Sequence, residues 1–513
     1  MLATTPPALS APGHQHRLPG AMTRSTTLGM LALLAIVLAG CGNPFSPPLN
    51  DPHLHPQAAT QDWPEFDYDS ARSGVNPQTT PLTAANVGQM QKLWAVQLPD
   101  VADSSPILLH GLTFPNGVKR DVLYVTTRDG RILALDAATG AQLWGHQPSG
   151  PKITHSSPVA DPNRQYIYAY GLDGYVHKYN AITGAESIGH GWPVQITLMR
   201  ETEKEGSALN IANGRLYVTT GGYIGDFVPY QGHVVTIDLA TGTTHVFNSL
   251  CSNIPHLLTD PECSSERSGI WARGGAVVDP VTGDVFAATG NGPYDADTHG
   301  FDYGDSVIKL TPNGDELLDS YTPTTQATLD ATDQDLGSVA PALLPQIKGS
   351  KTPLLLVQGG KDGVLRLLNR QNLSGAGGPG HEGGELQALS LPGCNLFAQP
   401  AAWTDPHTGA VWLFAPFTCG LTAFRVTTNA AGVTTLQQAW KISDTVTSPV
   451  LAGGALYAVE TGRILALDPT TGHTLWSATQ GVGGIHWESP IVVGGALYIG
   501  DENGAFMAYG LAA

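Results

Sequence analysis

The stretch GRILALDAATGAQLW at residues 130–144 recurs almost unchanged as GRILALDPTTGHTLW at residues 462–476. In each copy, a short apolar run predicts a strand that is buried on both faces. The Asp-x-x-Thr-Gly that follows predicts a turn, because the aspartate can accept hydrogen bonds from backbone N–H groups ahead of it and glycine can adopt a positive φ. The final tryptophan is a large apolar anchor in the next strand. Looser copies lie at residues 175–184 and 234–242.

A second element precedes these copies. It is a small residue and a proline followed by apolar residues, as in SSPILL at residue 104, and weaker versions include VAPALLP at residue 339. A further apolar strand, such as DVLYVTT or GALYIGD, lies between the two elements. Eight such units follow one another with a period of roughly 40–50 residues. Four short strands per unit at this period predict an all-β chain, an eight-bladed β-propeller of four-stranded antiparallel blades.

The two ends of the repeat predict how the ring closes. The last unit stops at GAFMAYGLAA, before a fourth strand, and the spare strand GQMQKLWAVQL lies at residues 88–98. We expect this N-terminal strand to complete the last blade, since an unclosed array would leave long exposed strand edges. Four tryptophans occupy the fourth strand of their units and are expected to pack between blades: Trp94, Trp144, Trp440 and Trp476.

The composition indicates the kind of fold and argues against two classes of partner. The 513 residues contain 61 glycines and 38 prolines, which favours a turn-rich fold over long helices. The formal net charge of −18 argues against nucleic acid or an anionic membrane surface as a partner, because both attract basic patches.

The N-terminus predicts an address in the cell envelope. The apolar run at residues 28–38 is too short to span a bilayer, so residues 1–40 are interpreted as a signal peptide, with Met22 as an alternative start. LAGC at residues 38–41 resembles the lipobox of bacterial lipoproteins, which implies a lipid on Cys41; an ordinary signal peptide is the alternative. The residue after Cys41 is Gly42 rather than an aspartate, which favours the outer membrane as the location of the lipoprotein. The predicted product is a lipid-anchored monomer that faces the periplasm or the exterior.

Residues 41–62 are predicted to form a proline-rich tether, and residues 63–513 the propeller. Apart from Cys41, the chain has an even number of cysteines, which in an oxidising compartment suggests two disulfides. We expect these to join Cys251 to Cys263 and Cys394 to Cys419. There is no Cys-x-x-Cys-His, so covalently attached haem is excluded.

Function is expected where the units stop resembling one another, in loops that a rigid ring directs toward its centre. The segments at residues 289–306 and 329–338 are rich in the oxygen ligands that Ca²⁺ prefers: Asn291, Asp295, Asp297, Asp302, Asp305, Asp330, Asp333 and Asp335. The alternative is that these residues are turn formers on a solvated rim. ETEKEGS at residues 201–207 is expected to be a solvated loop, although Glu205 could reach the funnel. Four histidines lack any metal-binding spacing and are expected in polar or core roles: His155, His177, His233 and His299.

The repeat, the opening DWPEFDYDSARSG…LTAANVGQMQKLW and the acidic loops resemble the eight-bladed quinoprotein alcohol dehydrogenases. That family uses pyrroloquinoline quinone (PQQ) with Ca²⁺ or a lanthanide. The resemblance extends over residues 63–513. It implies the same propeller, and an alcohol-oxidising site whose residues can be carried over only where the motifs match.

Three motifs match. ATGNGP implies that Asn291 is a metal ligand, and DATDQD implies that Asp333 is the catalytic base and a metal ligand, with Asp335 as the additional carboxylate of lanthanide-using members. GGKDGVLRLLNR implies that Lys361 contacts the quinone carbonyls, and GCNLF implies that Asn395 touches the cofactor. Each residue type suits the chemistry, because a carboxylate can take the hydroxyl proton and a cation can stabilise the reduced quinone.

The chain also departs from the family. It has no adjacent cysteine pair, and Arg273 stands at the position of the tryptophan that floors the quinone, with Trp271 two residues away. Phe227 stands where the family has a metal-ligating glutamate, and Asp226 is the nearest carboxylate. Trp271 and Arg273 are therefore candidate cofactor contacts, and Asp226 is a candidate metal ligand.

Three hypotheses follow. The first is a lipid-anchored dehydrogenase for a small alcohol, dependent on PQQ and on Ca²⁺ or a lanthanide. The second is a non-catalytic scaffold similar to the propeller lipoproteins of outer-membrane assembly, which would dock envelope proteins. The third is a binding module whose acidic loops hold Ca²⁺.

Overall fold

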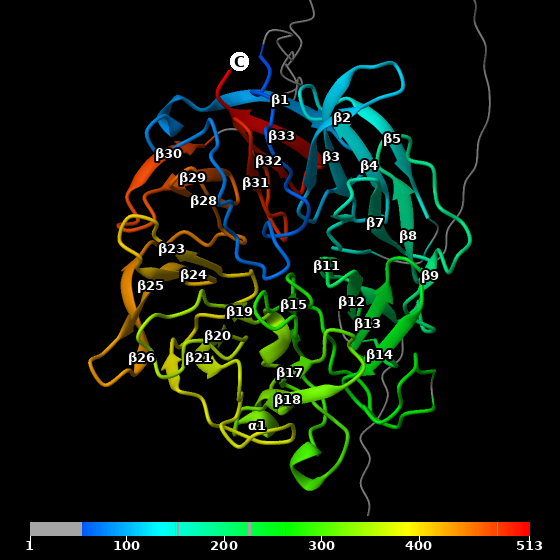
Figure 1. The fold of residues 1–513 in the computed structure, drawn as a ribbon, viewed down its shortest axis with the longest axis vertical. Coiled ribbons are helices and arrows are strands. Elements are labelled where there is room, and N and C mark those ends of the chain that lie inside the picture. The colour runs from blue at the N-terminus through cyan, green and yellow to red at the C-terminus, as the bar shows by residue number, and fades with distance from the viewer. Residues whose placement is uncertain are drawn as a thin grey trace, which may run out of the picture. The chain divides into compact units, whose positions relative to one another are not determined.

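The computed structural model describes residues 54–148, 150, 153–223, 227–259, 261–479 and 481–512. Their strands form eight antiparallel sheets, which follow one another around a ring (Figure 1). Each sheet is one blade of four strands, and blade 3 has an additional short strand. The predicted eight-bladed propeller is confirmed.

Within each blade the strands run in order from the ring axis outward. Blade 1 contains β2 (Ile107–Thr113), β3 (Lys119–Thr126), β4 (Ile132–Asp136) and β5 (Gln142–His146). Blade 2 contains β6 (Val159–Ala160), β7 (Tyr166–Gly171), β8 (Tyr175–Asn180) and β9 (Val194–Gln195). Blade 3 contains β10 (Glu203–Glu205), β11 (Asn210–Ala212), β12 (Arg215–Gly222), β13 (His233–Asp238) and β14 (Thr244–Asn248). Blade 4 contains β15 (Val277–Val278), β16 (Val285–Ala288), β17 (Val307–Leu310) and β18 (Leu317–Tyr321).

The remaining blades follow the same order. Blade 5 contains β19 (Ala342–Leu343), β20 (Leu355–Gln358), β21 (Val364–Asn369) and β22 (Gln387–Ser390). Blade 6 contains β23 (Ala401–Thr404), β24 (Val411–Phe417), β25 (Gly420–Thr428) and β26 (Thr434–Lys441). Blade 7 contains β27 (Val450–Ala452), β28 (Ala455–Glu460), β29 (Arg463–Leu467) and β30 (Thr474–Ala478). Blade 8 contains β31 (Ile491–Val493), β32 (Ala496–Gly500) and β33 (Ala505–Gly510), and the N-terminal β1 (Gln91–Gln97) completes it.

The helical segments described are short. They are α1 (Gln326–Ala331) and the single-turn segments η1 (Val87–Gln89), η2 (Ala296–Thr298) and η3 (Leu336–Ser338). Within the described residues, no helix is long and apolar enough to cross a membrane.

The ring closes as predicted. β1 pairs antiparallel with β33, and Lys92 lies opposite Tyr509 while Gln97 lies opposite Ala505. The two ends of the repeat therefore share one sheet, so that the first and last units leave no unpaired edge between them.

The repeated glycine and tryptophan contact each other across blades. Gly140 adopts a φ of +73°, and a Cβ at this position would lie only 2.9 Å from the indole ring of Trp94 in the preceding blade. The Trp94 indole N–H also donates to the carbonyl of Ala137 in the same turn, at 3.1 Å. Trp144 and Gly184 repeat this contact one blade further. Glycine is thus required both for the turn and for the neighbouring indole, which explains why the two residues recur together.

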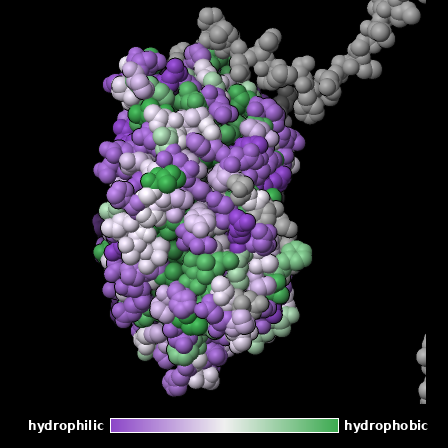
Figure 2. All heavy atoms as spheres, turned by 90° about the vertical axis from the view of Figure 1, so that its right-hand side faces the viewer, coloured by the Kyte–Doolittle hydropathy of each residue, from purple (hydrophilic) through white to green (hydrophobic). Residues whose placement is uncertain are grey.

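Buried apolar side chains fill the spaces between sheets. Leu133 of blade 1 and Phe506 of blade 8, for example, belong to one buried cluster, as sheets packed face to face require. The outer face drawn in Figure 2 is mostly polar, with a smaller apolar area. The core of the molecule therefore lies between blades.

Both predicted disulfides are present, Cys251–Cys263 and Cys394–Cys419. Cys41 and the predicted signal peptide lie outside the described residues. Residues 54–62, which belong to the predicted tether, contact the propeller, since Pro56 pairs with Ala512 after β33 and the Ala59 N–H donates to the Asp121 carboxylate in β3.

The segment at residues 63–76, which we call the strap, crosses the ring along the innermost strands. Its backbone forms hydrogen bonds with Leu108 of blade 1, Ala160 of blade 2, Val278 of blade 4, Ala402 of blade 6 and Leu451 of blade 7. These five residues hold the same place in their units, two residues after the proline of the repeat or the alanine that replaces it. One end of the inner strands is therefore engaged by the strap.

Candidate functional site

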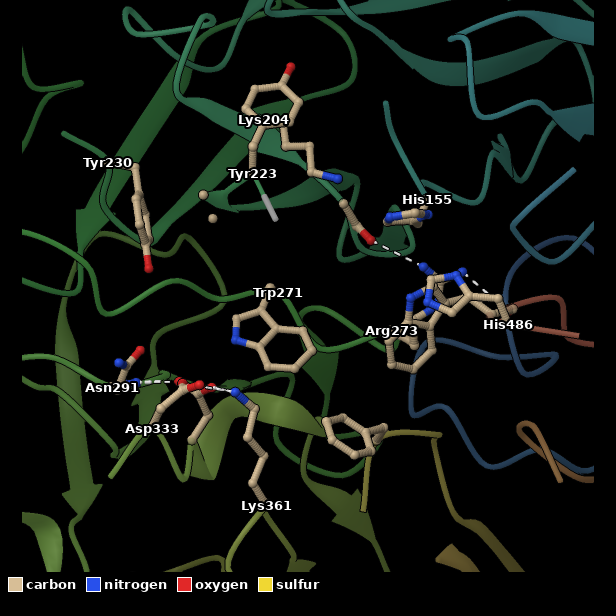
Figure 3. A pocket seen from close by; sticks show the side chains of 16 residues that line it. His155, Lys204, Tyr223, Tyr230, Trp271, Arg273, Asn291, Asp333, Lys361 and His486 are labelled. Atoms are coloured by element: carbon tan, nitrogen blue, oxygen red, sulfur yellow. Dashed lines mark hydrogen bonds and ion pairs between the residues drawn. The ribbon is translucent and has the colours of Figure 1, made fainter. Parts of the chain in front are cut away.

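The other end of the inner strands lines a cavity. A cavity of about 510 Å³ contains four side chains that stand three residues before the same proline or its replacement, namely His155, Arg273, Phe397 and Trp487. Because the units repeat, the position three residues before the proline faces the cavity in several blades. The strap contacts repeat in the same way at the other end of the inner strands, two residues after the proline. Lys204 of β10 and residues of the connecting loops complete the wall (Figure 3), the latter being Tyr223, Tyr230, Trp271, Asn291, Asp333, Asp335, Lys361 and His486.

Four of the predicted site residues meet at one side of this cavity. Lys361, in the loop after β20, places its Nζ 3.0 Å from Asp333 Oδ1 and also in contact with Asp335 Oδ2. Asp335 Oδ1 accepts a hydrogen bond from the backbone N–H of Asn291 at 2.5 Å. The ammonium group lies 5.4 Å from the centroid of the Trp271 ring. We call Asp333, Asp335 and Lys361 the lysine–carboxylate cluster.

The two carboxylates of the cluster have different environments. The Asp335 side chain is 4% exposed, and the Asp333 side chain is 65% exposed. Burial raises the pKa of Asp335, and the adjacent Lys361 opposes this effect. Behind it, burial raises the pKa of Asp305 to about 8, and Asp305 Oδ2 has no hydrogen-bond partner among the described residues. This side of the cavity therefore places three carboxyl groups near Lys361, and burial raises the pKa of two of them.

Other predicted ligands lie elsewhere. Asn395 does not line the cavity; its side-chain amide donates to the backbone carbonyl of Lys361 at 2.8 Å, so it positions the lysine loop. Asp226 lies outside the described residues. In the acidic loops, Asp295 and Asp302 accept backbone N–H groups, and Asp330 pairs with Arg267. Asp295 thus acts within its own loop, as the turn-forming alternative predicts, whereas Asp302 and Asp330 contact other segments.

Trp271 and Arg273, the two candidate floor residues, both line the cavity. The Arg273 guanidinium is buried and donates to the backbone carbonyls of Asp103 at 3.1 Å and Trp487 at 3.3 Å. It also lies 5.2 Å from the centroid of the Trp487 ring. Burial lowers the pKa of Arg273, but a guanidinium stays charged. The chain thus supplies a fixed positive charge where the family has an aromatic floor.

Lys204 is a cavity residue that the sequence did not indicate. The expectation of a solvated loop at residues 201–207 is wrong, because Glu203–Glu205 forms β10 and pairs with β12. The buried Glu203 of this strand has a polar partner, since its Oε1 lies 3.1 Å from His233 Nε2. Burial lowers the pKa of Lys204 to about 8. Its ammonium lies 5.3 Å from the Tyr223 ring centroid and forms no hydrogen bond with a residue that the structure describes.

His155 and His486 lie on the wall near Arg273 (Figure 3). The sequence placed His155 in a polar or core role because spacing along the chain links it to no other ligand. The signal that could have found it is the register of the repeat, since His155 occupies the same place before its proline as Asp103 does in blade 1.

The cavity can therefore accept a flat anion. Aromatic rings line it, three cations face it, and a carboxylate is exposed beside one of them. Fold and site together define an eight-bladed propeller with a ligand cavity at the ring axis.

Comparisons with known proteins agree with this class. The family model for the β-propeller domain of glucose/ethanol/alcohol dehydrogenases, PQQ, matches residues 63–375, and the chain belongs to this family. A second model, for the outer membrane protein assembly factor BamB, matches residues 425–512.

Individual relatives are distant. The dehydrogenase subunit of a quinone alcohol dehydrogenase from Gluconacetobacter polyoxogenes is 26% identical over 279 residues, which are 46% of this chain and 35% of the relative. The chain thus spans about a third of that protein's length. Quinohemoprotein alcohol dehydrogenase from Comamonas testosteroni superposes with a TM-score of 0.62 at 16% identity, over 89% of this chain and 81% of that one. A europium-containing methanol dehydrogenase gives 0.60 at 15% identity, over 88% and 98%. These two likenesses show the shared fold.

Proposed function

We propose that the cavity binds PQQ and that the protein uses it to oxidise a small alcohol in the cell envelope, anchored by a lipid on Cys41. The observation that carries this proposal is the lysine–carboxylate cluster on the cavity wall, with an exposed Asp333 beside a charged Lys361. Family membership and the quinone-dependent relatives support it.

The residues present fit the quinone. PQQ is a flat aromatic o-quinone that carries several carboxylates, and the cavity offers aromatic side chains together with Lys204 and Arg273. The Lys204 ammonium has no hydrogen-bond partner in the part of the chain that the structure describes. A ligand carboxylate would supply the missing partner for this largely buried cation.

The residues also offer hard donors for a Ca²⁺ or lanthanide ion. Asn291, Asp333 and Asp335 would hold it, since carboxylate and amide oxygens are the ligands these ions prefer. The unpartnered Asp305 oxygen behind them fits a site that is short of positive charge. The ion would add to the charge that Lys361 already supplies.

In the proposed reaction, the cofactor and the residues of the cavity have different roles. PQQ, when bound, supplies the two-electron acceptor for alcohol oxidation. Asp333 is exposed to the cavity and would accept the hydroxyl proton of the substrate. Lys361 contacts this carboxylate at 3.0 Å and presents its positive charge to the ligand. Trp271 and the other aromatic rings give the cavity wall an apolar surface that a bound quinone would contact.

Calorimetry with PQQ tests the proposal. We expect the full-length protein to bind PQQ saturably in the presence of Ca²⁺ or La³⁺, and Asn291→Ala and Lys361→Ala to weaken binding about tenfold or more, because each removes a polar contact at the ligand. Lys309→Ala is the matched control, since Lys309 pairs with Asp284 outside the cavity at 3.0 Å. Absence of binding with either ion would remove the dehydrogenase proposal.

PQQ affinity should also fall as the pH rises through about 8. Lys204 has its pKa lowered to about 8, so its ammonium is charged at pH 7 and largely neutral at pH 9.5. Burial raises the pKa of the neighbouring Glu205 to about 8, so this carboxylate gains negative charge over the same range. Both changes weaken the binding of an anion. Calorimetry at pH 7 and 9.5 should show about a tenfold loss in the wild type and a smaller one in Lys204→Gln; equal losses would contradict the assignment to Lys204.

A second candidate function is docking of envelope proteins by the propeller as a scaffold. It is favoured by the match of residues 425–512 to the model for an outer-membrane assembly factor. This function needs no cofactor, so a protein that binds no PQQ in the calorimetry above would favour it over alcohol oxidation.

A further inference from the structure

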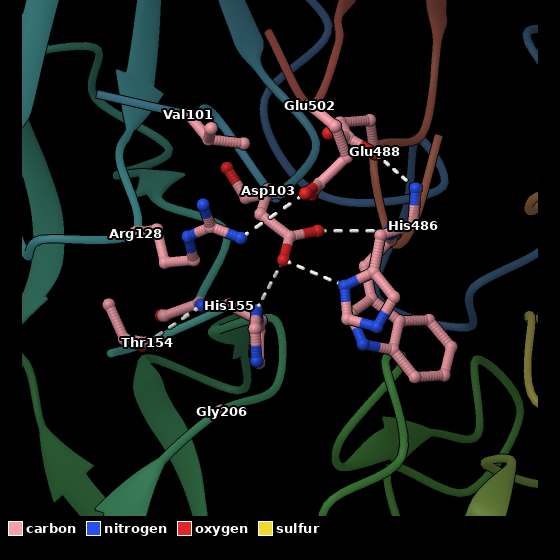
Figure 4. Close-up of polar contacts among 12 residues, drawn as sticks. Val101, Asp103, Arg128, Thr154, His155, Gly206, His486, Glu488 and Glu502 are labelled. Carbon is pink, nitrogen blue, oxygen red and sulfur yellow. Dashed lines mark hydrogen bonds and ion pairs between the residues drawn. The ribbon is translucent and has the colours of Figure 1, made fainter. Parts of the chain in front are cut away.

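Asp103, His155 and His486 bring three metal-ligating groups together (Figure 4). The two histidines lie on the cavity wall away from the lysine–carboxylate cluster (Figure 3). Asp103 Oδ2 lies 2.8 Å from His155 Nδ1 and 2.9 Å from His486 Nδ1. All three ligand atoms lie within 4.8 Å of one another. The residues come from blades 1, 2 and 8, which are neighbours because the ring closes.

The surroundings hold this group in place. The backbone N–H of Trp487 donates to Asp103 Oδ1 at 2.9 Å and orients the carboxylate, leaving Oδ2 to the two imidazoles. Such a donor to the second oxygen is typical of the shell around a metal ligand. His155 and His486 also line the cavity, whereas Asp103 is buried behind them.

Glu488 is an independent sign that a cation is accommodated here. It is completely buried, and its Oε1 has no hydrogen-bond partner among the residues described. Its carboxylate lies with those of Asp103 and Glu502, each within 4.8 Å of the others. Arg128 pairs with Glu502 at 3.3 Å, and Glu488 Oε1 stays without a hydrogen-bond partner among the described residues. A divalent ion held by Asp103 would place positive charge beside this buried carboxyl group.

We propose that Asp103, His155 and His486 bind a divalent first-row transition metal ion, with its open coordination positions directed into the cavity. Two imidazoles and one carboxylate form a ligand set that suits Zn²⁺ and its neighbours, whereas Ca²⁺ and Mg²⁺ prefer oxygen ligands alone. Three protein ligands leave room for water or a ligand at the metal. The proposal is independent of PQQ binding, because it uses none of the residues of the lysine–carboxylate cluster.

Zinc titration tests it without PQQ. The full-length protein is stripped with a chelator and titrated with Zn²⁺ by calorimetry, and Co²⁺ is added in parallel to record the visible absorption of a nitrogen-ligated site. We expect one equivalent to bind, and its affinity to fall about tenfold or more in His155→Ala and in His486→Ala. Zn²⁺ should raise the Tm of the wild type and not that of these two variants.

The control is His110→Ala, which removes a histidine that pairs with Asp62 at 2.7 Å and does not line the cavity. This variant should still bind one equivalent of Zn²⁺ and show the same cobalt spectrum as the wild type. Equal zinc affinity in all variants would show that other histidines bind the ion, and would overturn the proposal. So would a wild type without measurable binding, since Asp103 would then only contact the two imidazoles. Circular dichroism of each variant separates loss of the site from loss of the fold.

Discussion

Replacing Arg72 with leucine is expected to destabilise the propeller by about 3–5 kcal/mol, because it removes one partner of a buried ion pair. Arg72 lies in the strap and is completely buried. Its guanidinium donates to Glu65 at 3.3 Å and to the backbone carbonyls of Gly274 at 3.0 Å and Leu209 at 2.9 Å. The change would leave these acceptors, and the buried carboxylates of Glu65 and Asp67, without their shared cation. Urea unfolding followed by tryptophan fluorescence measures the loss.

Two further variants separate charge from geometry. Arg72→Lys keeps a positive charge but lacks the planar fork of donors, so we expect an intermediate loss. Arg215→Leu breaks a partly exposed pair with Asp238 at 3.4 Å and should cost at most about 1 kcal/mol. If Arg72→Leu cost no more than Arg215→Leu, the strap would not be what holds the inner strands together.

Asp333→Asn should lower the kcat of PQQ-dependent alcohol oxidation by about 10²–10⁴-fold, if Asp333 is the base of the proposed reaction. The amide keeps the shape of the side chain and cannot accept the hydroxyl proton. Asp335 cannot replace it, since it is buried and both its oxygens are engaged by Asn291 and Lys361. Dye reduction by the PQQ-loaded protein with a panel of short alcohols measures kcat and KM separately.

Asp330→Asn provides the comparison for this experiment. Asp330 lies in α1, three residues before Asp333, and pairs with Arg267 at 3.6 Å without lining the cavity. The activity of this variant should stay within about twofold of the wild type, as for a surface substitution. An Asp333→Asn variant that kept more than about a tenth of the wild-type kcat would assign the proton to another group. PQQ affinity measured in parallel distinguishes this result from loss of the cofactor.

Part of the site follows from local sequence. Asp333 and Asp335 are two residues apart, and Lys361 belongs to the same blade, so a matching motif was enough to predict that they lie together. Asn291 joins them from the loop after β16, one blade earlier. Asn395 was predicted to touch the cofactor, and the structure instead places its amide on the backbone of Lys361. A motif indicates which loop a residue belongs to, but not whether its side chain faces the cavity or the backbone of a neighbouring loop.

The ring itself was determined by the sequence, because its rules are local. The Asp-x-x-Thr-Gly turn, the glycine beneath a neighbouring tryptophan and the apolar strands between them recur around the ring, and each repetition specifies the same contact with the next blade. Only the tertiary structure decided which side chains come together at the ring axis. Asp103 and His486 lie near opposite ends of the chain, and they meet because β1 joins β33 and makes blades 1 and 8 neighbours. Lys204 likewise enters the cavity because its strand is buried by pairing that its charged sequence does not predict.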